Sequence, residues 1–287
     1  MFFEKRHRVA VWSVSSAVGA LAILLPILTG LYVPEKPYLI PLSREVNNAM
    51  ALGLVVALLP PAFVEYSNHK WGREVDRNIP GLLRDLTESI RSGVTLPRAL
   101  DEATKRDYGP LSREMERALA RFILGASWEE ALTFLAERLN RPSVKRLCTI
   151  LIEAHQVGGR MMEVLNSSVE LFSSLEEYRE EKYTQMSPYT ATLYMAALIF
   201  LVIGNIVLRQ FLIPLAETQS SLIMGELLPH LLDIDYYRSI LFWASIIESL
   251  FGGFVAGKIG DGSIRAGLRH SVVLLSITIL FFNILAT

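Results

Sequence analysis

Cysteine is almost absent from this chain, in which Cys148 is the only one among 287 residues. A single thiol excludes an intramolecular disulfide and a cysteine-rich zinc cluster. Leucine and isoleucine surround Cys148 in the sequence, so we interpret it as a small core side chain and not as a nucleophile. The five histidines are scattered. His155 lies only two residues from Glu153, so this pair cannot share one helix face as metal ligands do, and we predict no metal site.

An excess of either charge is also absent, because 28 Lys and Arg residues stand against 29 Asp and Glu residues, for a net charge of −1. Such a chain has no overall basic field, so nucleic acid is not expected as a partner. Ser167 and Ser168 have no histidine beside them in the sequence to form a nucleophile pair. We therefore predict no catalytic residue, no cofactor and no enzyme activity.

Hydrophobic residues, by contrast, make up 51% of the chain, and its mean hydropathy is +0.34. They form blocks long enough to cross a bilayer, at about residues 9–29, 46–66, 188–213, 240–257 and 270–286. The fully apolar part of the second block is brief and ends at Pro60-Pro61, so we expect a tilted or kinked span there. Pro214 is expected to end the third span.

The distribution of basic residues predicts the orientation of these spans. Lysine and arginine directly precede the first span, and Lys258, Arg265 and Arg269 occupy the link 258–269 between the last two. The loop 214–238 has four acidic residues and one arginine. Because lysine and arginine favour the cytoplasmic side, 258–269 is predicted to be an inner loop and 214–238 an outer loop. The N-terminus is then cytoplasmic and the C-terminus lies outside a cell membrane, inner or cytoplasmic.

Charged residues recur throughout the segment 67–187, between the second and third spans. Its apolar residues, such as Leu82, Leu86 and Ile90, stand at helical spacing, and no alternating strand pattern is visible. We predict helices that start near Ile79, Leu96, Leu111, Trp128, Ser143 and Arg160. The predicted fold is all-α: a polytopic membrane protein with about five transmembrane helices and one cytoplasmic six-helix bundle inserted after the second span. Its parts are residues 1–66 with two spans, 67–187 with the bundle and 188–287 with three spans.

Two copies of one helix-junction motif lie in this segment, offset by 32 residues. Gly93 and Gly125 are each followed two residues later by a potential capping residue, Thr95 or Ser127, and then by an apolar residue and Ala-Leu. Glycine suits the left-handed position that ends a helix, and threonine or serine can cap the next helix. Glu130 completes a capping box with Ser127. A repeat of this length is typical of helix-turn-helix units.

A weaker third copy begins at Gly158-Gly159, where Arg160 occupies the capping position. Ordinary punctuation between helices explains any single copy equally well, because glycine before serine or threonine is common at helix ends. All six junction residues are therefore candidates for a structural role: Gly93, Thr95, Gly125, Ser127, Gly158 and Gly159.

The fourth span contains the strongest candidates for a ligand-binding or ion-binding role. Residues 252–258 match the start of a phosphate-binding loop, but Ile259 replaces the serine or threonine that would hold magnesium. Gly253 and Gly257 have instead the spacing of closely packed membrane helices. Glu248 lies at mid-span, where an ionisable group pairs, is protonated or faces a polar interior. An interhelical hydrogen bond and a role in a transporter or channel subunit both remain open for Glu248.

The two junctions, the sequence Glu153-Ala154-His155-Gln156-Val157-Gly158-Gly159 and the span that follows make the chain resemble the type II secretion system F family. Its members are platform proteins of type II secretion systems, type IV pili, tight-adherence pili and archaeal flagella. The resemblance is strongest over about residues 80–213. The ending from Gly253 to His270 is similar to the archaeal-flagellum and tight-adherence branch. This chain has one helical domain where many members have two.

The resemblance implies a non-enzymatic membrane anchor that passes motion from a cytoplasmic hexameric secretion ATPase to pilin-like subunits. It further implies that Lys258, Arg265 and Arg269 contact the motor, and that Glu248, Gly253 and Gly257 contact a membrane helix or a pilin. A single helical domain implies a homo-oligomer or a sister platform protein as partner, within the lipid membrane.

Overall fold

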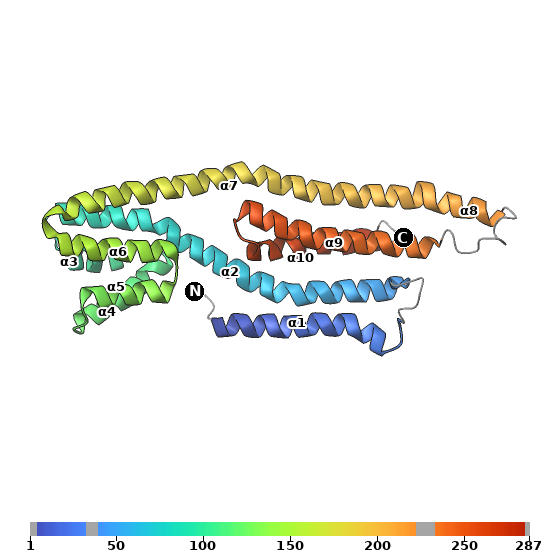
Figure 1. Ribbon diagram of the computed structural model, residues 1–287, viewed down its shortest axis with the longest axis horizontal. Coiled ribbons are helices and arrows are strands. Elements are labelled where there is room, and N and C mark those ends of the chain that lie inside the picture. The colour runs from blue at the N-terminus through green and yellow to red at the C-terminus, as the bar shows by residue number, and fades with distance from the viewer. Residues whose placement is uncertain (1–4, 33–39, 222–232, 285–287) are drawn as a thin grey trace. The chain divides into compact units, whose positions relative to one another are not determined.

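The computed structural model describes residues 5–32, 40–221 and 233–284, and every regular element within these ranges is a helix (Figure 1). The all-α fold predicted from the sequence is thereby confirmed. Five helical stretches in the described residues are long and apolar enough to cross a membrane, as predicted. The α-helices are α1 (Lys5–Leu28), α2 (Arg44–Arg91), α3 (Leu96–Thr104), α4 (Pro110–Ile123), α5 (Trp128–Leu139), α6 (Pro142–Val157), α7 (Met161–Ile206), α8 (Ile213–Ser221), α9 (Ile234–Gly260) and α10 (Leu268–Ile284).

The chain divides into two compact units. We call residues Ser67–Thr184 the bundle unit, which contains α3 to α6 together with parts of α2 and α7. The described residues of Lys5–Tyr66 and Gln185–Thr287 form the span unit, which contains α1, α8, α9, α10 and the remaining parts of α2 and α7. Helices α2 and α7 therefore contribute to both units.

Helix α2 corrects one expectation, because it runs without a break from Arg44 to Arg91. No new helix begins near Ile79, and the helix is also continuous through Pro60-Pro61. A proline inside a helix removes only one hydrogen bond and crowds one carbonyl group. Around Pro80 this local cost is offset by tertiary packing, since Ile79, Leu82 and Leu83 of the same helix are fully buried.

Helices α7 and α8 correct a second expectation. Helix α7 passes through Pro188 and reaches Ile206, and the helical path continues beyond Pro214 to Ser221. Residues Val207–Leu212 between α7 and α8 form a π-helix, η2. This wider turn rearranges the hydrogen bonds just ahead of Pro214, whose ring nitrogen has no hydrogen to donate. Residues 222–232 of the predicted outer loop lie outside the described residues.

Large aliphatic side chains from all its helices form the core of the bundle unit. The largest fully buried ones are Ile79, Leu82, Leu83, Leu86, Leu96, Leu100, Leu111, Met115, Leu132, Leu135, Leu139 and Leu147. Cys148 is also in this core, where burial raises the pKa of its thiol to about 12. Such a thiol is protonated at neutral pH, which fits a structural role.

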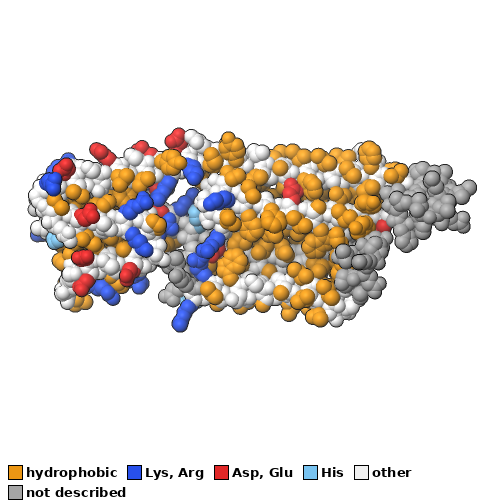
Figure 2. All heavy atoms as spheres, in the orientation of Figure 1, with side chains coloured by type: hydrophobic (Ala, Val, Ile, Leu, Met, Phe, Trp, Pro, Cys, Tyr) orange, Lys and Arg blue, Asp and Glu red, His pale blue; other side chains and the backbone are white. Residues whose placement is uncertain are grey.

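The span unit presents the opposite pattern. In Figure 2 hydrophobic side chains cover the visible surface of its helices, whereas Lys, Arg, Asp and Glu side chains are concentrated on the bundle unit. Helices α9 and α10 pack closely against each other, and hydroxyl groups lie between them: Ser249 and Thr278 form a buried 2.7 Å hydrogen bond. Asn48 of α2 donates to Asn283 of α10 across 2.7 Å. Polar side chains thus join the helices that carry the apolar surface.

Candidate functional site

The two glycine junctions have the same backbone geometry. Gly93 and Gly125 have φ values of +91° and +103°, in the left-handed region. At the first junction, Gly93 donates to the carbonyl of Ile90 and the next residue donates to that of Ser89; Gly125 and its successor repeat these two bonds 32 residues later. The pattern matches a Schellman motif, which satisfies the free carbonyl groups at a helix C-terminus. Both junctions therefore end a helix in the same way.

The starts of the following helices differ. Ser127 accepts a hydrogen bond from the backbone of Glu130, and the Glu130 carboxylate accepts one from the backbone of Ser127, so the capping box is present. Thr95 also occupies the N-cap position of its helix, but its side chain makes no capping hydrogen bond. Pro97, within the first turn, has no N–H to offer, and Arg98 stands where the second junction has Glu130.

The third junction takes another form. Gly158 has a φ of +54°, and Gly158–Arg160 form a 3₁₀ turn, η1, between α6 and α7. A Cβ atom added at Gly158 or Gly159 would meet no atom within 4 Å. The turn is therefore open, and its geometry is that of a chain reversal without a side-chain cap.

An ion pair buried in the bundle unit was not anticipated from the sequence. Arg141, the residue before α6, donates to Asp76 of α2 through Nε at 3.0 Å and also through a second nitrogen. Ser143 donates to the same carboxylate at 2.6 Å. The Asp76 side chain is 7% exposed. No local pattern could reveal this pairing, because Asp76 and Arg141 are 65 residues apart.

A second polar cluster joins α2 to the start of α4. Tyr108 donates from its hydroxyl group to Asp85, and Arg106 lies 2.6 Å from the same carboxylate. Burial, followed by the hydrogen bond to Asp85, raises the pKa of Tyr108. A tyrosine that is protonated at all ordinary pH values serves as a fixed donor, so this cluster has a positioning role.

The predicted motor contacts separate into two groups. Lys258 at the end of α9 and Arg265 in the 3₁₀ turn η4 (Arg265–Gly267) are exposed. Arg269 instead lies 2.6 Å from Asp261, whose side chain is 1% exposed. Its guanidinium group also lies over the Tyr66 ring, 5.3 Å from the centroid. Two of the three basic side chains are therefore available to a partner, whereas Arg269 is engaged within the span unit.

The glycines of α9 face the following helix. A Cβ atom on Gly253 would lie 2.2 Å from the backbone nitrogen of Ser271, and one on Gly257 would lie 2.1 Å from Gly267. These distances are shorter than any van der Waals contact, so only glycine permits this close approach. The side of each glycine on which a Cβ atom would lie is therefore in contact with α10 or η4.

Glu248 lies on α9 with its side chain partly buried. Within the described part of the chain it makes no hydrogen bond or ion pair. Other polar side chains of α9 pair with neighbouring helices: Trp243 donates to Asn47 at 2.8 Å, and Asn47 donates to Ser239 at 3.0 Å. The structure brings no second ionisable group of residues 5–32, 40–221 and 233–284 into hydrogen-bonding or ion-pair contact with Glu248.

Metal chemistry has no support in the described ranges, which contain no group of three or more His, Cys, Asp or Glu side chains placed to hold an ion. His155 packs beside the Trp128 ring, with centroids 5.5 Å apart. Its environment is therefore aromatic.

Comparison with known proteins identifies a domain in this chain. The model of the family described as type II secretion system (T2SS), protein F, matches residues 82–208, which confirms the family predicted from the sequence. An uncharacterized protein of Methanocaldococcus jannaschii is 25% identical over 243 residues, which are 83% of this chain and 38% of that protein. The chain thus spans well under half the length of this curated relative. No solved structure matches the chain.

Proposed function

Because residues 82–208 form a type II secretion system F domain, we propose that this multi-span membrane protein is the platform protein of a type IV filament or a type II-like secretion machine. It anchors a cytoplasmic hexameric ATPase and passes the motion of that motor to pilin-like subunits. The match to residues 82–208 carries this proposal. It covers most of the charged bundle unit and the apolar half of α7.

The two units have different proposed roles, which follow from the chemistry of their surfaces. Residues 67–187 form the cytoplasmic domain that meets the motor, and residues 1–66 and 188–287 form the spans that meet pilin-like subunits in the cell membrane. The charged surface of the bundle unit suits water, and the apolar surface of the span unit suits lipid (Figure 2). The basic link at Lys258 and Arg265 supports a cytoplasmic N-terminus and an outer C-terminus.

The proposed role is mechanical and not catalytic. The F family consists of non-catalytic membrane platform proteins, and an anchor needs only surfaces that bind the motor and the subunits. A homo-oligomer or a sister platform protein completes the platform. The alternative, a transporter or channel subunit, rests on Glu248 alone. Ion pathways usually join several ionisable groups, and among the described residues no second ionisable group forms a hydrogen bond or ion pair with Glu248. The hydrogen bonds of Ser239, Trp243 and Ser249 on the same helix are made to uncharged side chains.

Co-purification tests the proposal directly. The full chain is extracted from native membranes and the proteins that accompany it are identified by mass spectrometry. We expect a hexameric secretion ATPase and pilin-like subunits among them. Recovery of ion-coupled transport in proteoliposomes, abolished by Glu248→Gln while no ATPase is recovered, would overturn the platform proposal in favour of the alternative.

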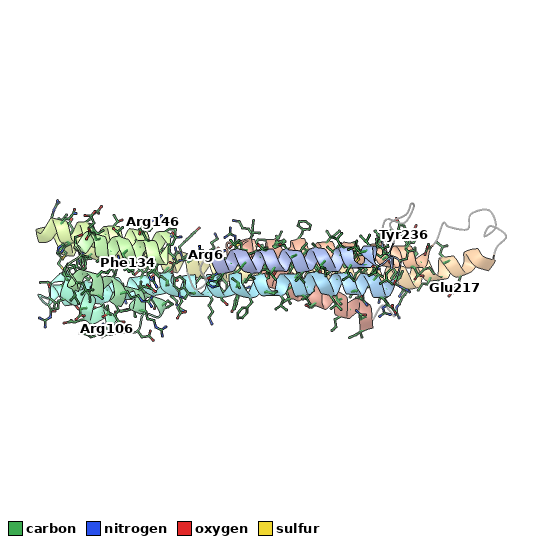
Figure 3. The ribbon with its side chains drawn as sticks, turned by 90° about the horizontal axis from the view of Figure 1, so that it is seen from below. Arg6, Arg106, Phe134, Arg146, Glu217 and Tyr236 are labelled. Carbon is green, nitrogen blue, oxygen red and sulfur yellow. The ribbon has the colours of Figure 1, made fainter. Side chains whose placement is uncertain are left out.

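The basic link allows a sharper test of the motor contact. Arg269 is unsuitable for charge reversal, because a glutamate there would face the buried carboxylate of Asp261 and destabilise the fold. Lys258→Glu and Arg265→Glu change exposed charges only. We expect each to lower ATPase recovery several-fold without a change in thermal stability. Arg6→Glu, which reverses another exposed charge in the span unit (Figure 3), is the matched control.

A further inference from the structure

The turn between α4 and α5 exposes an unusual amount of apolar surface. Ile123 and Leu124 are 73% and 87% exposed, more than any other large apolar side chain described in the bundle unit. Isolated exposed apolar residues are ordinary. Here two adjacent ones protrude at a tight turn whose glycine, Gly125, holds them in place. They add nothing to the core, so folding does not explain them.

A surface groove of about 630 Å³ lies beside this turn, on the first residues and outer face of α5. Phe134 (Figure 3) lines it. Arg121 covers the Phe134 ring, with its guanidinium carbon 3.7 Å from the ring centroid. The stacked pair gives the groove a flat, partly apolar wall. An apolar edge beside such a wall is suited to a side chain that brings its own hydrocarbon surface.

Carboxylates determine the charge of the groove. Glu129, Glu130 and Glu137 line it, against the single guanidinium group of Arg121. Glu130 is engaged in the capping box. In the described part of the chain, Glu129 and Glu137 have neither a hydrogen-bond nor an ion-pair partner, and both are exposed. They are eight positions apart on one helix face, or about 12 Å along the axis.

We infer, resting on the proposed function, that this groove and the Ile123-Leu124 edge bind a basic amphipathic helix of the motor ATPase. Charge selects this occupant: two unpaired carboxylates two helical turns apart match two Lys or Arg residues with the same separation on one face of a partner helix. The apolar residues of that helix then cover Ile123 and Leu124. A basic segment without apolar residues would leave this edge exposed to water.

Photo-crosslinking in native membranes tests the inference with the full chain. Leu124 is replaced by p-benzoylphenylalanine, and the crosslinked partner is identified by mass spectrometry. We expect an ATPase peptide with basic residues two turns apart. The same replacement at Arg146, an exposed residue of α6 (Figure 3), is the positional control and should give little of this product.

Charge variants of the crosslinking protein show whether the carboxylates contribute. Glu129→Gln with Glu137→Gln should lower the ATPase crosslink about fivefold at low salt, since each exposed pair contributes modestly. The effect should shrink as salt is raised. Glu163→Gln with Glu170→Gln removes two exposed, unpaired carboxylates seven positions apart on α7 and should leave the yield unchanged.

The outcomes separate the inference from the function on which it rests. Recovery of ATPase by the unmodified chain, with equal crosslinking at Leu124 and Arg146 or no effect of the Glu129 and Glu137 changes, would overturn the docking site and leave the platform function intact. A crosslink from Leu124 to a second copy of this chain would assign the edge to self-association and also overturn it. Failure to recover any ATPase would defeat both.

Discussion

The bundle unit and the span unit differ in which side chains they bury and which they expose. In the bundle unit, leucine and isoleucine side chains such as Leu82 and Leu83 are fully buried. In the span unit, serine and threonine are buried at the contact of α9 with α10, and large apolar side chains such as Phe251 and Leu280 are 61% and 63% exposed. The span unit also buries large apolar side chains such as Phe242 and Leu275, but it leaves many others exposed.

This difference follows from the solvent that each unit requires. Water drives large apolar side chains into a core, because burial removes their surface from water. Lipid chains are as apolar as leucine side chains, so moving leucine from lipid into a helix contact gains no hydrophobic free energy. Membrane helices associate instead through close packing of small residues and through hydrogen bonds. The pattern of burial thus supports the membrane assignment by a route that is independent of hydropathy along the sequence.

The largest expected effect on stability comes from truncating a buried leucine of the bundle unit, compared with the same truncation in the span unit. Leu83→Ala removes a fully buried side chain from the bundle core and should lower the free energy of unfolding by about 2–5 kcal/mol, through lost burial and the cavity that remains. Leu280→Ala truncates a leucine of α10 that is mostly exposed and, in a bilayer, faces lipid. It should cost less than about 1 kcal/mol. Thermal unfolding in detergent, followed by circular dichroism, measures both.

Equal losses of unfolding free energy in these two variants would contradict the proposal that water surrounds the bundle unit and lipid surrounds the span unit. A large loss for Leu280→Ala alone would show that this face of α10 is covered by protein. The comparison uses the same chemical change in both units, so differences in side-chain size cannot account for the result.

Local signals explain why much of the fold could be predicted. Hydropathy, helical spacing and the Gly93 and Gly125 junctions depend on neighbouring residues, and they correctly predicted helices and five apolar stretches. Continuity through Pro80 and Pro214 could not be predicted, because it depends on tertiary packing and on a π-helix. A proline signals a probable helix boundary and does not guarantee one.

The candidate sites show the same limit more clearly. Lys258, Arg265 and Arg269 form one basic cluster in the sequence, but only the structure distinguishes the two exposed residues from Arg269, which pairs with Asp261. The Asp76–Arg141 pair had no sequence signal at all, because its members are distant in the chain. Net charge and motif spacing cannot assign partners at such separations.

A smaller effect is expected from glycine substitutions that probe the close contact in the span unit. Gly253→Ala would place a Cβ atom 2.2 Å from the backbone nitrogen of Ser271, so α9 and α10 must separate, at about 1–3 kcal/mol. Gly252→Ala has the same gain in helix propensity, but its Cβ atom would lie 3.9 Å from Leu274. Thermal stability of the two variants in nanodiscs isolates the steric cost. Equal stability of the two variants would contradict the inference that α9 and α10 are in close contact at Gly253.

The smallest expected effect concerns the two junctions within the bundle unit, which end one helix identically and begin the next differently. Ser127→Ala removes the half of the capping box that the Ser127 hydroxyl group makes, the hydrogen bond from the backbone of Glu130, and should destabilise the unit by about 0.5–2 kcal/mol. Thr95→Ala removes a hydroxyl group that caps nothing and should change stability by no more than about 0.5 kcal/mol. Denaturant midpoints of the two variants, measured under the same conditions, give the difference directly. A larger loss for Thr95→Ala would mean that the Thr95 hydroxyl group caps α3 in solution. The two junctions would then match at both the helix end and the helix start, because a side chain would cap α3 as well as α5.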